Sequence, residues 1–222
     1  MFGGHKISKQ YGKKQILRDV SFVQDGNKII ALFGLNGKGK TTLFRILSGL
    51  DGNFTGDVYK KDFEDVAYMS VDTIYPVSMR IKDIIKFHAT FTPALNIVAI
   101  ERDLRLAGMD LRSILPALSS GMRQYFKFLL TIYSGASVCL FDEPFVHLDI
   151  EWRERMAQTL IRGIREDRLF IIATHEIKEV ETLIDGFYIL SDSGLSDYYD
   201  VEETVAATGQ SIQAFYKENM HE

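Results

Sequence analysis

The segment Gly34–Thr42 has the pattern G-x-x-x-x-G-K-T, which is typical of a loop that binds phosphate. Apolar residues 29–33 precede it and residues 43–47 continue as an amphipathic pattern, so the order is strand, loop, helix. Backbone amides at such a helix start favour an anion. Lys40 would place a charge between the β- and γ-phosphates, and Thr41 would offer a hydroxyl to Mg²⁺. The complete pattern in this context favours nucleotide binding over an ordinary glycine-rich turn.

Two carboxylates follow a second apolar run. Asp142 and Glu143 come directly after residues 138–141, which predict a buried parallel strand whose carboxyl end faces a ligand crevice. Asp142 could hold Mg²⁺ through water, and Glu143 could orient or deprotonate an attacking water. The alternative is that the two carboxylates only cap the next turn.

A histidine follows a third apolar run. Residues 169–173 predict another buried strand, and His175 comes just after it. A neutral imidazole there could hydrogen-bond a γ-phosphate or a water. A lone histidine after a strand is usually structural, but the place of His175 after another strand of the same predicted α/β sheet favours a functional role.

Two further features depend on context. Ser119 and Gly121 precede an amphipathic helix, where Ser119 predicts an N-cap, and the exposed amides of such a helix end can bind phosphate. Tyr11 lies next to a turn. From its residue type alone, Tyr11 is better explained as a half-buried packing residue.

The elements around these residues predict an α/β fold. Residues 1–33 alternate as an antiparallel β layer in front of the core, and residues 76–116 have helical spacing that predicts an inserted lobe. We expect one domain, with a core of residues 1–75 and 117–222 and a helical subdomain at about 76–116. Other expected elements are helices over 41–50, 150–165 and 176–184, strands near 56–59, 66–71 and 186–190, and a helical tail from about 201.

Composition narrows the possible partners and compartment. The 222 residues carry a net charge of −4, which argues against a general nucleic-acid binder. Cys139 is the single cysteine, so no intrachain disulfide can form, which fits a reducing cytoplasm. We find no signal peptide and no apolar stretch of about 18 to 20 residues, so we expect a membrane role only through a partner.

Taken together, the ordered motifs resemble the ATPase subunits of ATP-binding cassette (ABC) transporters over essentially the whole chain. The resemblance implies a P-loop NTPase core, and it makes Tyr11 a candidate adenine-stacking residue. The matching segments are residues 34–42 (Walker A), 118–124 (signature), 138–143 (Walker B), 146–149 (D-loop) and His175 (switch).

The family resemblance implies a head-to-tail dimer that binds ATP and Mg²⁺ between two subunits. It assigns catalysis to Glu143 and His175 and Mg²⁺ contacts to Thr41 and Asp142. Contacts to the partner's ATP would come from Ser119, Gly121 and Asp149. The residues expected to bind ATP within the chain are Tyr11, Gly34, Asn36, Gly37, Gly39, Lys40, Thr41 and Thr42.

The sequence departs from the family pattern in three places. No glutamine occurs between Gln24 and Gln124, so the Q-loop glutamine is missing and Asp72 is a possible substitute Mg²⁺ contact. Met122 stands where the family signature commonly has a glutamine, so a hydrogen-bonding amide is missing. A methionine at this position is similar to a subset of bacterial exporters. Lys38 replaces a small residue in the phosphate loop, and we expect its side chain to point to solvent.

We therefore expect the cytoplasmic ATPase subunit of a bacterial ABC transporter, an exporter rather than an importer. It would lie at the inner face of the membrane through a membrane-spanning subunit and pair with a second ATPase subunit, with no nucleic-acid partner. The alternative is a degenerate, nucleotide-gated partner subunit with weak hydrolysis of its own. A soluble cassette acting on ribosomes or DNA is disfavoured by the acidic charge and the single cassette.

Overall fold

The computed structural model describes residues 1–60, 66–70, 75–164 and 168–219. Val71 and Asp72, the positions expected to replace the Q-loop glutamine, lie outside these residues. Within the described part, no helix is both long enough and apolar enough to cross a membrane.

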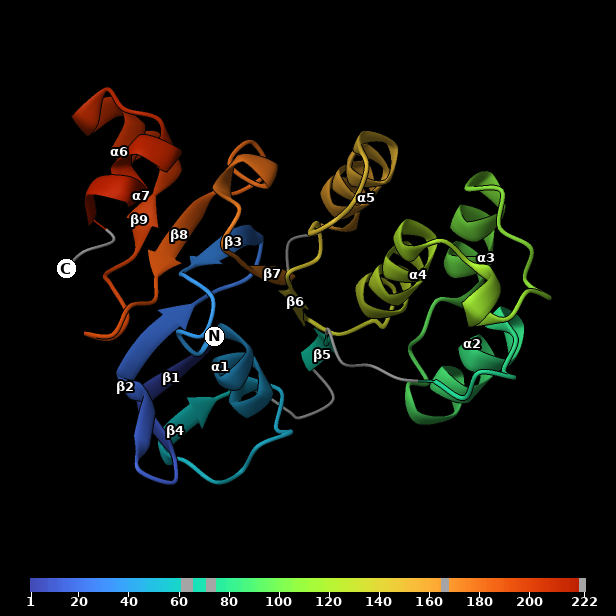
Figure 1. The fold of residues 1–222 in the computed structure, drawn as a ribbon, viewed down its shortest axis with the longest axis horizontal. Coiled ribbons are helices and arrows are strands. Elements are labelled where there is room, and N and C mark those ends of the chain that lie inside the picture. The colour runs from blue at the N-terminus through green and yellow to red at the C-terminus, as the bar shows by residue number, and fades with distance from the viewer. Residues whose placement is uncertain (61–65, 71–74, 165–167, 220–222) are drawn as a thin grey trace.

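A six-stranded sheet in the order β5-β6-β7-β3-β8-β9 forms the centre of the molecule (Figure 1). Neighbouring strands are parallel except β9, which is antiparallel to β8. The apolar runs predicted as β3, β6 and β7 are buried, as expected for parallel strands covered on both faces. The strands of this sheet are β3 (Lys28–Phe33), β5 (Val66–Met69), β6 (Val138–Asp142), β7 (Leu169–Thr174), β8 (Gly186–Ile189) and β9 (Tyr199–Asp200).

Alternate side chains of β3 enter two different cores. Ile30 and Leu32 join a cluster with Phe44 of α1 and with the N-terminal strands. Ala31 and Phe33 face the larger cluster, which includes residues of α2, α3, α4, α5 and α7. The period of two along a strand therefore places the phosphate loop between two packed layers. The helices are α1 (Lys40–Leu47), α2 (Ile81–Phe91), α3 (Ile97–Leu106), α4 (Ser120–Ile132), α5 (Ile150–Gly163), α6 (Val201–Thr208) and α7 (Ile212–Asn219).

A separate antiparallel sheet in the order β2-β1-β4 confirms the predicted N-terminal layer. Its third strand comes from the segment after α1, which the sequence placed only as a short strand. The strands of this sheet are β1 (Phe2–Tyr11), β2 (Lys14–Gln24) and β4 (Thr55–Tyr59).

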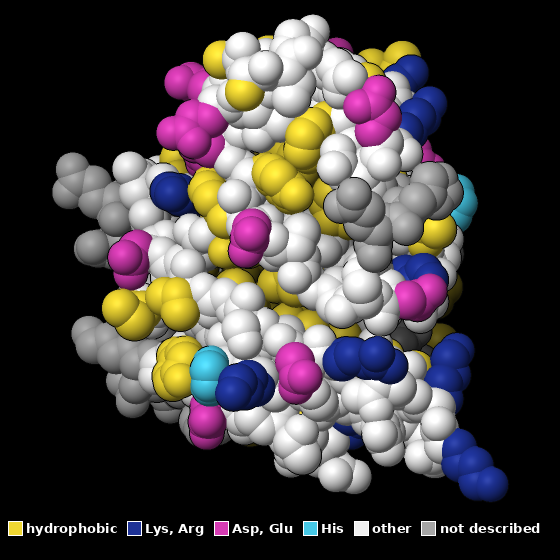
Figure 2. Space-filling model, turned by 90° about the vertical axis from the view of Figure 1, so that its left-hand side faces the viewer, with side chains coloured by type: hydrophobic (Ala, Val, Ile, Leu, Met, Phe, Trp, Pro, Cys, Tyr) yellow, Lys and Arg dark blue, Asp and Glu magenta, His cyan; other side chains and the backbone are white. Residues whose placement is uncertain are grey.

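On the face of the molecule that Figure 2 shows, basic and acidic side chains are interspersed.

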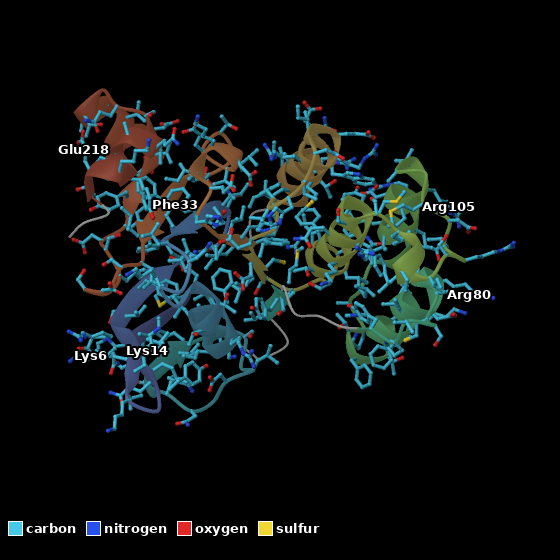
Figure 3. The ribbon with its side chains drawn as sticks, viewed as in Figure 1. Lys6, Lys14, Phe33, Arg80, Arg105 and Glu218 are labelled. Carbon is cyan, nitrogen blue, oxygen red and sulfur yellow. The ribbon has the colours of Figure 1, made fainter. Side chains whose placement is uncertain are left out.

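The helical region after β5 contains α2 and α3 and lies at one end of the molecule (Figure 1). The predicted apolar spacing is realised by Ile81, Ile84 and Ile85, which are buried. Arg80 and Arg105 lie at the outer edge of this region, far from Lys6 and Lys14 (Figure 3). The subdomain limits of 76–116 stay a prediction.

The helix predicted over residues 176–184 is wrong. The structure has only a 3₁₀ turn, η3 (Ile177–Glu179), followed by further turns. A second such turn, η2 (Leu115–Ala117), precedes α4. Ile177, Val180 and Ile184 are buried as their spacing suggests, but i→i+3 bonds such as Val180 to Ile177 bury them without a full helix. Apolar spacing over so short a segment does not distinguish a helix from a series of turns.

Candidate functional site

The phosphate loop connects β3 to α1, as predicted. Gly39 is the N-cap of α1 with φ 102°, and a Cβ there would lie 2.8 Å from Leu17 Cδ2 and 3.1 Å from the Ile16 carbonyl. Glycine is therefore required by both backbone and space. Of the other predicted loop residues, Gly34 is buried, Asn36 and Gly37 are exposed, and Thr42 is half-buried.

Lys40 lies inside the loop with only 6% of its side chain exposed. Its Nζ donates to the Gly34 carbonyl at 2.6 Å and to the Leu35 carbonyl at 3.4 Å. The same atom lies 3.4 Å from Glu143 Oε1. A buried ammonium needs such acceptors because the interior does not solvate it.

Asp142 ends β6 beside the loop. Its Oδ2 accepts from the Thr41 hydroxyl at 2.7 Å and from the Tyr68 hydroxyl at 3.1 Å. Burial raises the pKa of Asp142, and the two hydrogen bonds oppose that shift. Burial also raises the pKa of Tyr68, so its hydroxyl stays protonated and donates. Sequence reasoning did not identify Tyr68 as a contact of Asp142.

The second oxygen of Asp142 matters for metal binding. Oδ1 is buried and has no hydrogen-bond partner within the described residues. An unpaired carboxylate oxygen beside the Thr41 hydroxyl is the kind of hard oxygen pair that Mg²⁺ prefers. In the described part of the chain, no group of three or more His, Cys, Asp or Glu side chains is placed to hold a metal ion by itself. An ion bound here would therefore take its other ligands from phosphate and water.

Glu143 is held on both of its carboxylate oxygens. Oε1 lies 2.9 Å from His175 Nδ1, and Oε2 accepts from the Thr174 hydroxyl at 2.8 Å. The Glu143 backbone has φ 47°, a strained value for a residue with a side chain, and its amide donates to the Ala173 carbonyl at 2.8 Å. Sequence reasoning identified His175 but missed Thr174.

The sheet register brings these residues to one edge. Phe33, the last residue of β3, pairs with Thr174 of β7, and Asp142 of β6 pairs with Ala173. Because the three strands are parallel neighbours, their carboxyl ends and the side chains that follow meet. The carboxylates bind neighbouring elements rather than only capping a turn, so that alternative is wrong.

An open hollow of about 1020 Å³ lies over this edge. Asn36 of the phosphate loop, Ser120 and Gln124 of α4, Glu143 and His175 all line it. The hollow has room for groups beyond those the chain itself supplies.

The residues predicted to act in trans lie at the starts of two helices. Ser119 caps α4, its hydroxyl accepting from the Met122 amide at 3.2 Å, and Asp149 caps α5 by accepting from the Trp152 amide at 3.0 Å. Both caps are exposed. In the described residues, neither is bonded to the phosphate loop or to Glu143. Gly121 is buried, and a Cβ on it would lie 2.5 Å from Trp152 Cδ1.

Two other predicted positions have unexpected contacts. Tyr11 is 51% exposed, and its hydroxyl donates to Asp51 Oδ2 at 3.1 Å, beyond the C-terminal end of α1. Its adenine-stacking role stays a prediction. Lys38 forms an ion pair with Asp192 rather than pointing freely to solvent, so that expectation is wrong.

A family model described as ABC transporter matches residues 17–146. The chain belongs to the ABC transporter family. It is therefore an ABC ATP-binding domain, an ATP-hydrolysing NTPase. A solved structure titled as the ATP-binding subunit of an ABC transporter shares the fold, with a TM-score of 0.84, 21% identity and 98% of each chain covered.

Two relatives illustrate the match in sequence. An uncharacterised ABC transporter ATP-binding protein of Methanocaldococcus jannaschii is 26% identical over 204 residues, covering 89% of this chain and 76% of the relative. An aliphatic sulfonates import ATP-binding protein of Shouchella clausii is 29% identical over 200 residues, covering 88% and 79%. Further relatives are also named for import. These relatives do not support the export direction expected from Met122.

Proposed function

We propose that this ABC ATPase domain binds ATP with Mg²⁺ at the phosphate loop, hydrolyses it with Glu143, and drives a membrane-spanning transporter subunit. The observation that carries this proposal is the contact of one carboxylate with two groups: Glu143 Oε1 lies 3.4 Å from Lys40 Nζ and 2.9 Å from His175 Nδ1. A general base, a phosphate-binding cation and a switch histidine thus meet at one point.

Phosphate binding would replace contacts that Lys40 now makes within the chain. The γ-phosphate would take over from Glu143 and the loop carbonyls, while the amides at the start of α1 bind the other phosphate oxygens. Tyr11, at the exposed turn between β1 and β2, would stack on the adenine.

Thr41 and Asp142 would hold Mg²⁺, and the unpaired Asp142 Oδ1 supports this assignment. The ion would neutralise charge on the β- and γ-phosphates. Asp72, the possible further contact, lies outside the described residues.

Glu143 would then act as the general base in hydrolysis. Its carboxylate orients a water and accepts a proton as the water oxygen bonds to the γ-phosphorus and the bond to the ADP oxygen breaks. Without nucleotide, His175 and Thr174 contact the two carboxylate oxygens and keep Glu143 at the sheet edge. His175 is also placed to donate to the γ-phosphate once Glu143 turns toward water.

A second ATPase subunit would complete the site. The exposed caps Ser119 and Asp149, and the hollow over Glu143, support a head-to-tail partner. Closure of the pair on ATP would move a membrane-spanning subunit, which would hold the chain at the inner face of the membrane. Relatives named for import favour uptake over export.

The test is the Glu143→Gln variant. We expect ATP hydrolysis to fall at least about 100-fold, because the amide cannot accept the proton, while ATP binding measured by calorimetry persists. Glu151→Gln is the matched control, since that side chain is 75% exposed on α5. Undiminished turnover in Glu143→Gln would show that another residue is the base.

The alternative is a degenerate partner subunit. The absence of glutamine between Gln24 and Gln124 favours it, because the Q-loop contact is missing. Robust turnover by the isolated wild-type protein in the same assay contradicts this alternative, whereas turnover only in a mixed-subunit complex supports it.

A further inference from the structure

An ion pair between the partly exposed Arg153 and the buried Glu179 connects the helix after the D-loop to the segment after His175. Arg153, in the first turn of α5, places Nη2 at 2.6 Å from Oε1 of Glu179 in η3. The Glu179 side chain is only 6% exposed. Removing a carboxylate from water to this extent is costly, so the pair depends on its geometry.

The same guanidinium also holds the D-loop. Arg153 Nη2 donates to the carbonyl of Leu148 at 3.3 Å, one residue before the cap Asp149. One nitrogen therefore bridges the D-loop backbone and the segment after the switch histidine. A separate bond, from His175 to Glu143, joins the start of the same switch segment to the end of β6. The active site and the D-loop are thus tied to the same short segment at two places.

Arg153 and Glu179 have the atoms for a second hydrogen bond that the structure does not show. Within the described residues, Arg153 Nε and Glu179 Oε2 are both buried and have no hydrogen-bond partner. A guanidinium and a carboxylate can form two parallel bonds, and only one is made here. A small shift of η3 against α5 would exchange the single contact for a double one.

The neighbouring residue connects α5 to the signature. The Trp152 ring packs on Gly121, where a Cβ would lie 2.5 Å from its Cδ1, and its centroid is 5.4 Å from that of Tyr125. Successive residues at the start of α5 therefore contact two different functional segments, Trp152 the signature helix and Arg153 the switch segment.

We propose that Arg153 and Glu179 are positioning residues that transmit the nucleotide state of the catalytic site from the His175 segment to the start of α5. A shift of His175 toward a bound γ-phosphate moves η3, and the ion pair passes this movement to Asp149 and, through Trp152, to the signature. The inference rests on the proposed function, because it describes how that ATP site is coupled to the surfaces that a second subunit would contact.

The experiment uses Trp152, the only tryptophan of the chain, as an optical reporter. MgATP is expected to change its fluorescence emission in the wild-type protein. In the double variant Arg153→Met/Glu179→Leu no buried charge is left unpaired, so the fold is retained. We expect the emission change to be largely lost and kcat to fall about tenfold, with ATP affinity by calorimetry staying within about twofold.

Two further variants make the result specific. The control Arg105→Met/Glu101→Leu makes the same substitutions in an exposed ion pair of α3. Arg105 lies well away from Phe33, the residue before the phosphate loop (Figure 3), so this control should behave as wild type. Glu179→Gln keeps the Oε1 acceptor for Arg153 and should retain most of the emission change. If the double variant fails to fold by circular dichroism, Glu179→Asp, which keeps the charge but shortens the reach, is expected to show the same losses.

The outcomes separate this inference from the proposed function. A wild-type protein that neither binds nor hydrolyses ATP contradicts the proposed function itself. A wild-type protein that binds ATP without any change in Trp152 emission overturns only the coupling. The coupling is equally overturned if the variant that removes the Arg153–Glu179 contact keeps both the emission change and kcat.

Discussion

The candidate catalytic edge, formed by Lys40, Glu143 and His175, and the two exposed helix caps differ in how their polar groups are satisfied. At the catalytic edge, Glu143 contacts both Lys40 and His175, and all three are buried or half-buried. At the caps, Ser119 and Asp149 are exposed, and among the described residues the side chain of each accepts only from an amide of its own helix. The first group is a site assembled within one chain. The second consists of donors and acceptors that face outward.

The physical chemistry explains why the two regions look so different without a ligand. A buried ammonium such as Lys40 must find acceptors inside the protein, so it contacts Glu143 and the loop carbonyls. An exposed cap has no such requirement, because water can satisfy its remaining lone pairs. The catalytic edge is therefore organised before substrate binds, while the caps gain new contacts only when something covers them.

Of the variants that compare the two regions, Lys40→Met at the catalytic edge is expected to have the largest effect. The apolar side chain fills similar space but leaves the phosphates and Glu143 without their cation. We expect the rate of ATP hydrolysis to fall about 100-fold, with clearly weaker ATP binding by calorimetry. Lys14→Met, on the N-terminal strand β2, should leave both unchanged. Wild-type affinity in Lys40→Met would mean that the loop amides alone hold the nucleotide.

A smaller effect is expected at the exposed caps, where Ser119→Ala would test whether they face a second subunit. Loss of an N-cap costs about 1 kcal/mol of stability wherever it occurs. Asp200→Ala, which removes the corresponding cap of α6, is the matched control for that cost. Only Ser119→Ala should also lower hydrolysis, by about tenfold, with ATP binding to the isolated chain unchanged. Equal turnover in the two variants would remove the support for an in-trans role.

Much of the fold could be predicted because the strands that form its centre are continuous apolar runs. Residues 29–33, 138–141 and 169–173 are fully buried, and such runs identify parallel strands without knowledge of their partners. The segment 177–184 could not be predicted in the same way. Its buried residues fit a helix and a series of turns equally well, and only tertiary packing decides between them.

The site shows the same limit. Lys40, Thr41, Asp142, Glu143 and His175 were found because a local pattern or a strand end marks each of them. Thr174 and Tyr68 were missed, since neither lies in a pattern that marks it. Their roles come from sheet pairing: Tyr68 of β5 lies opposite Leu140 of β6, and Thr174 opposite Phe33. Contacts that depend on the order of strands in a sheet cannot be predicted from a short stretch of sequence.

The smallest effect is expected at Thr174, whose hydroxyl holds Glu143 Oε2 at 2.8 Å. Thr174→Val keeps the shape of the side chain and removes the donor, whereas Thr174→Ser keeps the donor. His175 still contacts the other oxygen, so we expect kcat to fall only about fivefold in the valine variant and to stay near wild type in the serine variant. Steady-state hydrolysis at saturating ATP measures both. If the valine variant keeps the wild-type kcat, the hydrogen bond from Thr174 is dispensable and the contacts of Glu143 Oε1 alone hold the carboxylate.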